Sequence, residues 1–312
     1  MPATLYWLQC GGCGGDSMSL LNAESPSMLE AFGMLDIELL WHPSLSNSSY
    51  KHHADMLERL ATGSQTLDYF CVEGAVITGP EGSGGYEHFH GNPKMELIRT
   101  LSGKARHTIA VGTCASFGGI SADCGIDAKG LQFTKDAPGG FLGTDYRSAA
   151  GLPVINLPGC PCHPDVVVGA LTALTHEADL DLDEFNRPLE WFGMLVHQGC
   201  TRNEYHEYRI EELDFGEKGC LFFHLGCQGP LAYGPCNKLL WNRRSCKTRV
   251  GVPCFGCVNP VFPQQTPFFE TPNIEGLPFN LPDGVDRAHY MAYKSMAAAA
   301  APERLKGRKT KV

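Results

Sequence analysis

The stretch TLYWLQCGGCGGDS (residues 4–17) decides the fold, because an apolar segment of strand length ends in a glycine-rich loop that carries metal-binding side chains. An apolar run of this length that stops at glycine is typical of a buried strand. The loop places Cys10, Cys13 and Asp16 at successive intervals of three residues. Zinc sites, redox disulfides and iron–sulfur ligands all use a C-x-x-C pair, so its chemistry has to be inferred from the rest of the chain.

The same pattern repeats through the first half of the chain. Further short apolar runs occupy residues 37–41, 67–76, 107–114 and 152–160, and segments with helical spacing lie between them at residues 25–35, 53–61, 93–103 and 164–176. Short buried strands that alternate with helices predict a parallel sheet covered on both faces. We therefore expect an α/β domain over residues 1–175.

Potential ligands gather where these strands are expected to end. The loop with Cys13 and Asp16 follows the first strand, Glu73 follows the third, and Cys114 and Cys160 end the last two. Open parallel sheets form their ligand crevice at the carboxyl ends of their strands. A single buried cysteine would be interpreted as a small apolar residue, but the convergence of several favours a ligand site.

Composition narrows the class of protein. The chain has 312 residues, 14 cysteines and a formal net charge of −9. The acidic balance argues against nucleic acid as a partner, and no apolar run approaches the roughly 20 residues that span a membrane. The start of the sequence lacks the pattern of a secretory leader and a twin-arginine pair, so we expect a cytoplasmic protein whose thiols are free to bind metal.

The second half of the chain differs from the first in composition and in hydrophobic periodicity. From about residue 197 it is rich in glycine, proline and aromatic residues without a sustained period, which predicts an irregular, cysteine-rich domain over residues 176–312. Its eight soft donors form two sets of four, and such sets suit zinc or an iron–sulfur cluster. They are His197, Cys200, Cys220, Cys227, Cys236, Cys246, Cys254 and Cys257. We expect the nearby histidines His163, His206 and His224 to be packed or hydrogen-bonded rather than ligands.

As an ordered set, the motifs resemble the small, electron-transferring subunit of nickel–iron hydrogenases. The pieces that carry the resemblance are WLQCGGCGGDS, DYFCVEGAV, GTCASFGG, LPGCPCHPD, HQGCTRNEY, CLFFHLGCQGP, CNKLLWN and PCFGCVNPVF, spread over nearly the whole chain. Without a leader or membrane helix, the sequence is most similar to the soluble, actinobacterial-type uptake enzymes. The resemblance implies a flavodoxin-like amino-terminal domain with one cluster and an irregular carboxyl-terminal domain with two more.

The resemblance also implies ligand sets for three iron–sulfur clusters, of which 4Fe–4S is expected and 3Fe–4S stays open. The proximal cluster would use Cys13, Asp16, Cys114 and Cys160; the distal cluster His197, Cys200, Cys220 and Cys227; and the medial cluster Cys236, Cys246, Cys254 and Cys257. The segments between Cys220 and Cys227 and between Cys246 and Cys254 are each one residue longer than the family pattern. Cys71, Cys124 and Cys162 have no assigned role, and we expect buried free thiols.

The register of the first loop leaves two interpretations open. When Trp7 is aligned with the aromatic residue before the family's C-T-G-C-S-E-S motif, Cys13 takes the place of the first cysteine and Asp16 that of the second. Cys10 is then idle. The alternative pairs Cys10 with Cys13 and shifts the loop by three residues, and we prefer the interpretation with Asp16.

The implied function is electron transfer in a hydrogen-oxidising enzyme. Electrons would pass from the active site of a nickel–iron large subunit, through the three clusters, to an acceptor near the distal cluster. This chain would carry no catalytic residue, and a higher oligomer of heterodimers stays open. Two alternatives remain: the small iron–sulfur subunit of quinone-reductase-type complexes, which resembles the amino-terminal half, and a zinc-stabilised interaction module.

Overall fold

The computed structural model describes residues 2–264, 268–274 and 276–305. The chain divides into two compact units. The first runs from the amino terminus to Glu190 and includes Pro260–Phe262, and the second holds Trp191–Asn259 and the chain after Phe262. Our predicted domains met at residues 175 and 176, whereas this division follows Glu190.

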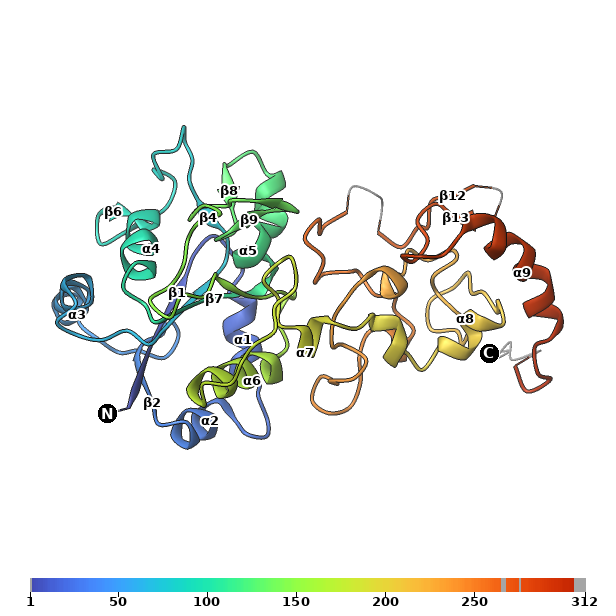
Figure 1. Ribbon diagram of the computed structural model, residues 1–312, viewed down its shortest axis with the longest axis horizontal. Helices are drawn as coiled ribbons and strands as arrows, with labels where there is room; N and C mark the ends of the chain where they lie inside the picture. The colour runs from blue at the N-terminus through green and yellow to red at the C-terminus, as the bar shows by residue number, and fades with distance from the viewer. Residues whose placement is uncertain (1, 265–267, 275, 306–312) are drawn as a thin grey trace. The chain divides into compact units, whose positions relative to one another are not determined.

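A parallel sheet of five strands forms the centre of the first unit (Figure 1). In spatial order it consists of β2 (Ile37–Trp41), β1 (Ala3–Gln9), β3 (Tyr69–Glu73), β7 (His107–Val111) and β11 (Ile155–Leu157). This is the strand order of flavodoxin-like folds, which place their ligand crevice where the order reverses. The predicted fold class is confirmed.

The strand register brings the ligand-bearing loops to one edge of the sheet. Gln9 at the end of β1 pairs with Glu73 at the end of β3, and Glu73 pairs in turn with Val111 at the end of β7. Because these strands are parallel and end together, the segments after them leave the sheet side by side. The loops with Cys13 and Cys114 thus start from neighbouring points.

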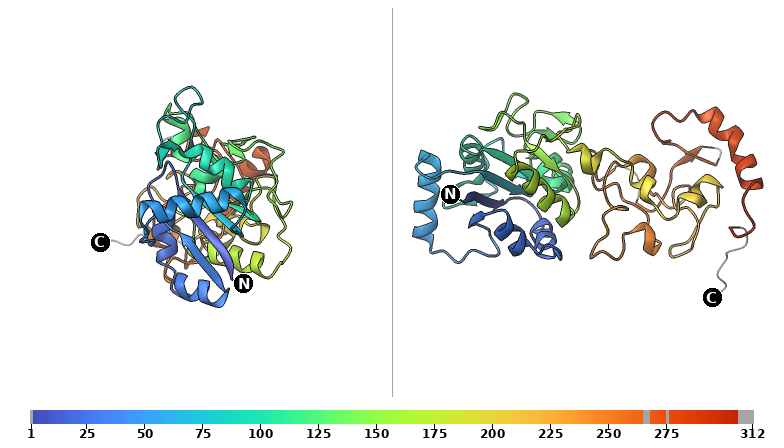
Figure 2. Two further views of the ribbon diagram at one scale, coloured as in Figure 1. Left: turned by 90° about the vertical axis from the view of Figure 1, so that its left-hand side faces the viewer. Right: turned by 60° about the horizontal axis from the view of Figure 1, so that its bottom comes forward.

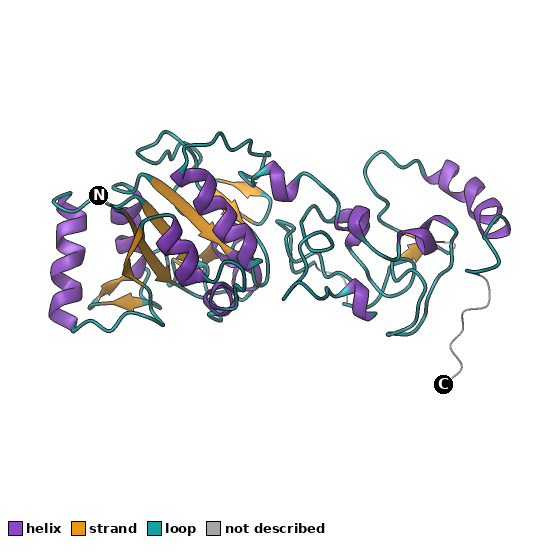
Figure 3. Cartoon of the chain, turned by 90° about the horizontal axis from the view of Figure 1, so that it is seen from below, coloured by secondary structure: helices purple, strands orange, loops and turns teal. Residues whose placement is uncertain are grey.

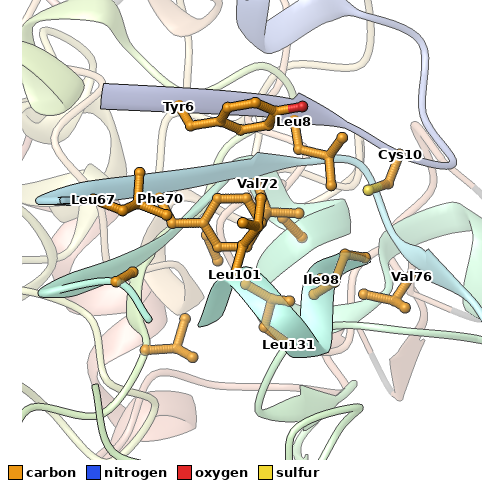
Figure 4. Close-up of a cluster of buried hydrophobic side chains, with 14 of the residues drawn as sticks. Tyr6, Leu8, Cys10, Leu67, Phe70, Val72, Val76, Ile98, Leu101 and Leu131 are labelled. Atoms are coloured by element: carbon orange, nitrogen blue, oxygen red, sulfur yellow. The ribbon is translucent and has the colours of Figure 1, made fainter. Parts of the chain in front are cut away.

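Helices cover both faces of this sheet (Figure 3). α3 (Tyr50–Thr62) and α4 (Lys94–Ser102) contact each other, as do α1 (Gly15–Leu21) and α6 (Pro164–Thr175). Side chains of a strand alternate between the two faces. One core cluster joins Tyr6, Leu8, Phe70 and Val72 to residues of α3 and α4, and Cys10 belongs to it (Figure 4). Burial of each large apolar side chain contributes about 1.5–3 kcal/mol, which makes the sheet a firm base for the loops.

Three predicted strands end earlier than expected. The run over 152–160 ends as a strand at Leu157, so Cys160 lies in the loop after it. Glycine is the reason for the other two. The run over 67–76 breaks after β3 at Gly74, which has φ +85°, and resumes as β4 (Val76–Ile77), which pairs with β8 (Ala128–Lys129). The run over 107–114 stops at Val111, because Gly112 also has φ +85° and begins α5 (Gly112–Phe117). Such φ values do not continue a strand. Cys114 therefore lies in α5 rather than at the end of a strand, which corrects that expectation.

Short elements complete the first unit. They are α2 (Met28–Met34), the β5–β6 pair (His88–Phe89 and Asn92–Pro93), η1 (Gly119–Asp123) and the β9–β10 pair (Phe133–Thr134 and Ala137–Pro138). α7 (Leu189–Phe192) lies at the division between the units.

Loops make up most of the second unit, as predicted (Figure 2). Its short elements are η2 (Val196–Gly199), α8 (Asn203–Glu207), η3 (Gly229–Leu231), η4 (Thr248–Val250), β12 (Asn273–Ile274) and β13 (Leu277–Pro278). The helix α9 (Arg287–Ala299) was not predicted; Asp286 caps it by accepting from the backbone N–H of His289 at 3.0 Å. Over the described residues, none of the helices combines the length and apolar character needed to cross a bilayer.

Candidate functional site

The buried carboxylate of Glu73 organises the first loop. It accepts hydrogen bonds from Trp7 Nε1 at 3.0 Å, from the backbone N–H groups of Asp16 and Ser17 at 2.9 and 3.0 Å, and from Ser17 Oγ at 2.5 Å. A carboxylate beside the first N–H groups of a helix satisfies donors that have no partner within the helix. Glu73 at the end of β3 thereby fixes the start of α1, and with it the place of Asp16.

The two cysteines of the loop have opposite surroundings. Cys10 is 4% exposed and belongs to the core cluster with Leu8, Val76 and Ile98 (Figure 4), and burial raises the pKa of its thiol far above the ordinary range. Its backbone N–H donates to Glu73 O at 2.7 Å. Cys13 is exposed. The structure thus directs Cys10 into the core, whereas Cys13 stays available at the edge of the sheet.

Asp16 lies where three loops meet. Its Oδ1 accepts from the backbone N–H of Cys162 at 2.7 Å, and a Cβ atom added to Gly112 would overlap its Oδ2. Asp16 is 9% exposed, and burial raises the pKa of its carboxyl to about 7, with the nearby Glu73 raising it further and the Cys162 N–H opposing the shift. A carboxylate of this kind is an expensive group to bury unless it has a specific partner.

Cys114 and Cys160 lie on segments that are joined to each other. Thr113 N donates to Gly159 O and Gly159 N donates to Thr113 Oγ1, both at 2.9 Å. Burial raises the pKa of the Cys114 thiol to about 11, and the negative charges of Asp16 and Cys13 raise it further. Three of the predicted proximal donors therefore lie close enough to interact electrostatically, and the fourth, Cys160, is exposed on a loop tied to α5.

In the second unit, one pocket collects the whole predicted distal set. His197, Cys200, Cys220 and Cys227 all line it. Burial lowers the pKa of His197, which favours the neutral imidazole that binds metal. Burial also raises the pKa of Cys227 to about 11, although backbone N–H groups of Gly229 and Cys254 oppose that shift.

A second pocket collects the whole predicted medial set. Cys236, Cys246, Cys254 and Cys257 all line it, together with Lys247. Burial raises the pKa of the Cys236 thiol to about 12, and the neighbouring Cys257 raises it further. Buried thiols that raise one another's pKa are unfavourable as free thiolates, but suit a site in which bound metal supplies the positive charge.

Asn237 and Thr248 line both pockets and thus form a shared wall. Both are almost fully buried, and Asn237 Oδ1 accepts from Thr248 Oγ1 at 2.8 Å and from Cys246 Sγ at 2.6 Å. Asn237 Nδ2 donates to Val196 O at 2.7 Å. The two donor sets are therefore neighbours held by one hydrogen-bonded unit, which their spacing in the sequence did not indicate.

Backbone N–H groups point at the sulfur atoms of both sets. Arg202 N lies 3.4 Å from Cys200 Sγ, Cys254 N lies 3.3 Å from Cys227 Sγ, and Gly256 N lies 3.4 Å from Cys254 Sγ. Hydrogen bonds of this type stabilise metal-bound thiolates and tune the potential of iron–sulfur clusters. The donor chemistry and the surrounding N–H groups fit such clusters.

The other predicted histidines behave as expected. His163 caps α6 by accepting from Asp165 N at 3.2 Å, and His224 Nε2 pairs with Glu211 Oε2 at 2.7 Å. His206 packs against Phe223, but its Nδ1 also lies 3.4 Å from Cys220 Sγ, a contact that the sequence analysis missed.

The unassigned cysteines fall into two kinds. Cys71 and Cys162 are buried, as expected of structural thiols, but Cys124 is exposed at the end of η1, where its Sγ lies 3.3 Å from Ile120 O. The expectation of a buried thiol is therefore wrong for Cys124.

Within residues 2–264, 268–274 and 276–305, no group of three His, Cys, Asp or Glu side chains is close enough together to hold a single metal ion. The eight donors of the second unit surround two pockets, four to each.

Two family models match the chain. Residues 13–174 match the NADH ubiquinone oxidoreductase, 20 Kd subunit, and residues 192–270 match the carboxyl-terminal part of the NiFe/NiFeSe hydrogenase small subunit. The first match fits the resemblance of the amino-terminal half to quinone reductases. The second covers the pockets of the second unit and distinguishes the chain from that alternative.

Relatives and solved structures agree with the second model. The chain is 34% identical over 287 residues to the F420 non-reducing hydrogenase I small subunit of Methanosarcina mazei, covering 83% of this chain and 73% of that relative. It is 34% identical over 284 residues to the periplasmic [NiFeSe] hydrogenase small subunit of Desulfomicrobium baculatum, covering 86% and 87%. A chain of the actinobacterial-type NiFe-hydrogenase from Ralstonia eutropha H16 superposes with a TM-score of 0.77 and 28% identity, covering 96% of this chain and 90% of that chain. This chain belongs to the small subunits of nickel–iron hydrogenases.

Proposed function

We propose that this protein is the electron-transfer subunit of a hydrogen-oxidising enzyme. Its partner is the hydrogenase large subunit, which holds the nickel–iron centre where hydrogen is activated. The observation that carries the proposal is the pair of adjacent pockets in the second unit, each lined by four soft donors. Two neighbouring donor sets in one unit suit a conducting path better than a single structural site.

The proposed ligand sets correspond to the pockets and the first loop. His197, Cys200, Cys220 and Cys227 would hold the distal cluster, and Cys236, Cys246, Cys254 and Cys257 the medial one. Cys13, Asp16, Cys114 and Cys160 would hold the proximal cluster at the edge of the sheet. The four thiols around the medial pocket support a 4Fe–4S cluster there, because that cluster type takes four ligands.

Bound clusters would supply one-electron carriers, so that the two electrons of hydrogen leave one at a time. The residues of this chain hold and insulate them. Glu73 fixes the start of α1 and so orients Asp16. Asn237 and Thr248 close the space between the two pockets of the second unit. Backbone N–H groups neutralise part of the negative charge on the cysteine sulfurs.

The first loop supports the register with Cys13 and Asp16. Cys10 is packed among apolar side chains, and its thiol would have to leave the core to reach a ligand. Asp16 and Cys13 each lie close enough to Cys114 to raise the pKa of its thiol, which burial already raises. A buried carboxylate that has a single N–H donor and a nearby carboxylate, Glu73, supports a role as a metal ligand, because a bound cation would offset the cost of burying its charge.

We also propose a cytoplasmic location, an acceptor that docks near the distal cluster, and assembly with the large subunit as a heterodimer that could associate further. The exposed thiol of Cys124 supports a reducing compartment, where such a group persists. Several relatives of this chain are periplasmic enzymes, so cell fractionation tests the location directly.

Anaerobic iron and sulfide analysis of the purified complex, with electron paramagnetic resonance, tests the proposal. Three clusters of the 3Fe or 4Fe type require roughly 9 to 12 iron atoms per small subunit. Stoichiometric zinc with little iron would instead support the zinc-stabilised module. A single cluster per chain would contradict the proposed path through two clusters in the second unit.

A further inference from the structure

His206 lies behind the distal pocket without lining it. Its Nδ1 is 3.4 Å from Sγ of Cys220, which does line the pocket. The side chain therefore contacts a proposed ligand without itself lining the pocket, as an outer hydrogen-bond partner would.

The position of His206 is fixed from three sides. Its ring stacks on Phe223 with centroids 5.2 Å apart and an interplanar angle of 19°, and meets the ring of His197 nearly edge-on at 4.4 Å. The backbone N–H of His206 donates to Arg202 O at 3.2 Å, and Cys220 N donates to Ile210 O at 2.8 Å. A side chain held this firmly loses little further freedom when it forms a hydrogen bond.

The chemistry of an iron-bound cysteine decides the direction of this hydrogen bond. A thiolate bound to iron carries no proton, so Cys220 can only accept. A neutral imidazole carries its proton on one of its two nitrogens, and the contact then selects the tautomer with hydrogen on Nδ1.

We propose that His206 is a positioning residue of the distal cluster, whose Nδ1–H donates to the Cys220 thiolate and thereby makes that cluster easier to reduce. The inference rests on the proposed function, because it needs a cluster at this pocket. A donor to a ligand sulfur withdraws negative charge, and the reduced form carries one more negative charge than the oxidised form. The hydrogen bond is therefore stronger in the reduced state and raises the potential.

The test compares His206→Gln with His206→Met in the purified heterodimer. Both variants remove the ring and have similar length, but only glutamine offers an N–H donor. The readout is the ratio of reduced to oxidised distal cluster at a fixed potential, followed by electron paramagnetic resonance. Loss of a signal in Cys220→Ala identifies the distal cluster.

We expect the reduced-to-oxidised ratio to be about three- to tenfold lower in His206→Met than in His206→Gln, the range for one net hydrogen bond. A tenfold change corresponds to about 59 mV for a one-electron couple. The medial cluster should be unchanged. His224→Phe is the matched control, because His224 lies between the proposed ligands Cys220 and Cys227 in the sequence but pairs with Glu211 instead of a cysteine.

Equal potentials in the two variants would overturn the inference, since ring packing would then be the whole role of His206. Loss of the distal iron in both variants, with the medial cluster retained, would likewise make the residue structural. The outcome for the proposed function is separate. A parent protein without iron–sulfur signals refutes that function, whereas a parent with intact clusters and no difference between the variants refutes only the role of His206.

Discussion

The proposed register of the first loop predicts opposite effects on iron content for substitutions of Asp16 and of Cys10. Asp16→Asn keeps an amide oxygen that can accept from the Cys162 N–H but removes the carboxylate that we propose as a ligand. The iron content should then fall from about 12 atoms per chain to about 8 if the proximal cluster is lost, or to about 11 if it converts from 4Fe to 3Fe. Cys10→Ala removes one buried sulfur from the core, which costs about 1 kcal/mol of stability and leaves the iron content unchanged.

Gly112 offers an independent route to the same result. A Cβ atom at this position would overlap Asp16 Oδ2, and the φ of +85° is already unfavourable for alanine. Gly112→Ala should therefore displace the carboxylate and reproduce the loss of iron. Gly63→Ala is the matched control, because Gly63 has φ +80° with no atom within 4 Å of an added Cβ. It should carry a similar backbone cost, about 1 kcal/mol, without any change in iron.

Iron and sulfide analysis of anaerobically purified protein measures these changes, and electron paramagnetic resonance identifies the cluster that is lost. The reasoning fails if Cys10→Ala destroys the proximal cluster while Asp16→Asn and Gly112→Ala leave its spectrum and potential unchanged. That result would establish Cys10 and Cys13 as the pair and would require the loop to move relative to β1.

Three further changes test other parts of the structure. Burial and the nearby His90 lower the pKa of His53 to about 4 from 6.5, so below pH 6.5 the unfolded chain gains a proton that the folded chain resists. Stability should therefore fall between pH 6.5 and 4, and denaturation midpoints of His53→Phe should fall less steeply over this range than those of the parent protein. Asn237→Leu removes the acceptor of Thr248 and the donor to Val196 O, so we expect a loss of about 1–3 kcal/mol and lower iron from both clusters of the second unit; normal iron at both would contradict a shared wall. The small subunit without its partner should not reduce dyes with hydrogen, and hydrogen-dependent activity of the isolated chain would refute the assignment of catalysis to the large subunit.

The sequence predicted the sheet because its strands are buried and its helices are amphipathic. The runs around Tyr6 and Phe70 have the length and flanking glycines of strands, and this signal is local. The short helices α1 and α5 were not predicted. Both begin at or just after glycines with positive φ, Gly14 and Gly112, and in the sequence such glycines indicate only that a strand ends. Whether a helix or a loop comes after the glycine depends on tertiary hydrogen bonds, such as those that the start of α1 donates to Glu73.

The grouping of the donors in the second unit was predicted only through the family resemblance. Spacing along the chain divided the eight donors into two sets of four, but it did not show which residues lie next to each set in space. Their contacts are long-range in sequence: Cys254 N lies 3.3 Å from Cys227 Sγ, across the two sets, and Asn237 reaches Val196 O. No local sequence pattern predicts such contacts, so the contacts of Asn237, Thr248 and His206 could be found only in the structure.

The two units therefore hold their donors by different means, and amino-acid substitutions in them should have different consequences for cluster occupancy. In the first unit the sheet register places the ends of β1, β3 and β7 side by side, and the loops depend on a core that exists without metal. A ligand substitution there, such as aspartate for cysteine, changes one corner of one site. In the second unit the donor sets share Asn237 and Thr248 and exchange hydrogen bonds, with little regular structure beneath them. Variants at the shared wall should therefore lower the occupancy of two clusters together, whereas variants in the first loop should lower the occupancy of one.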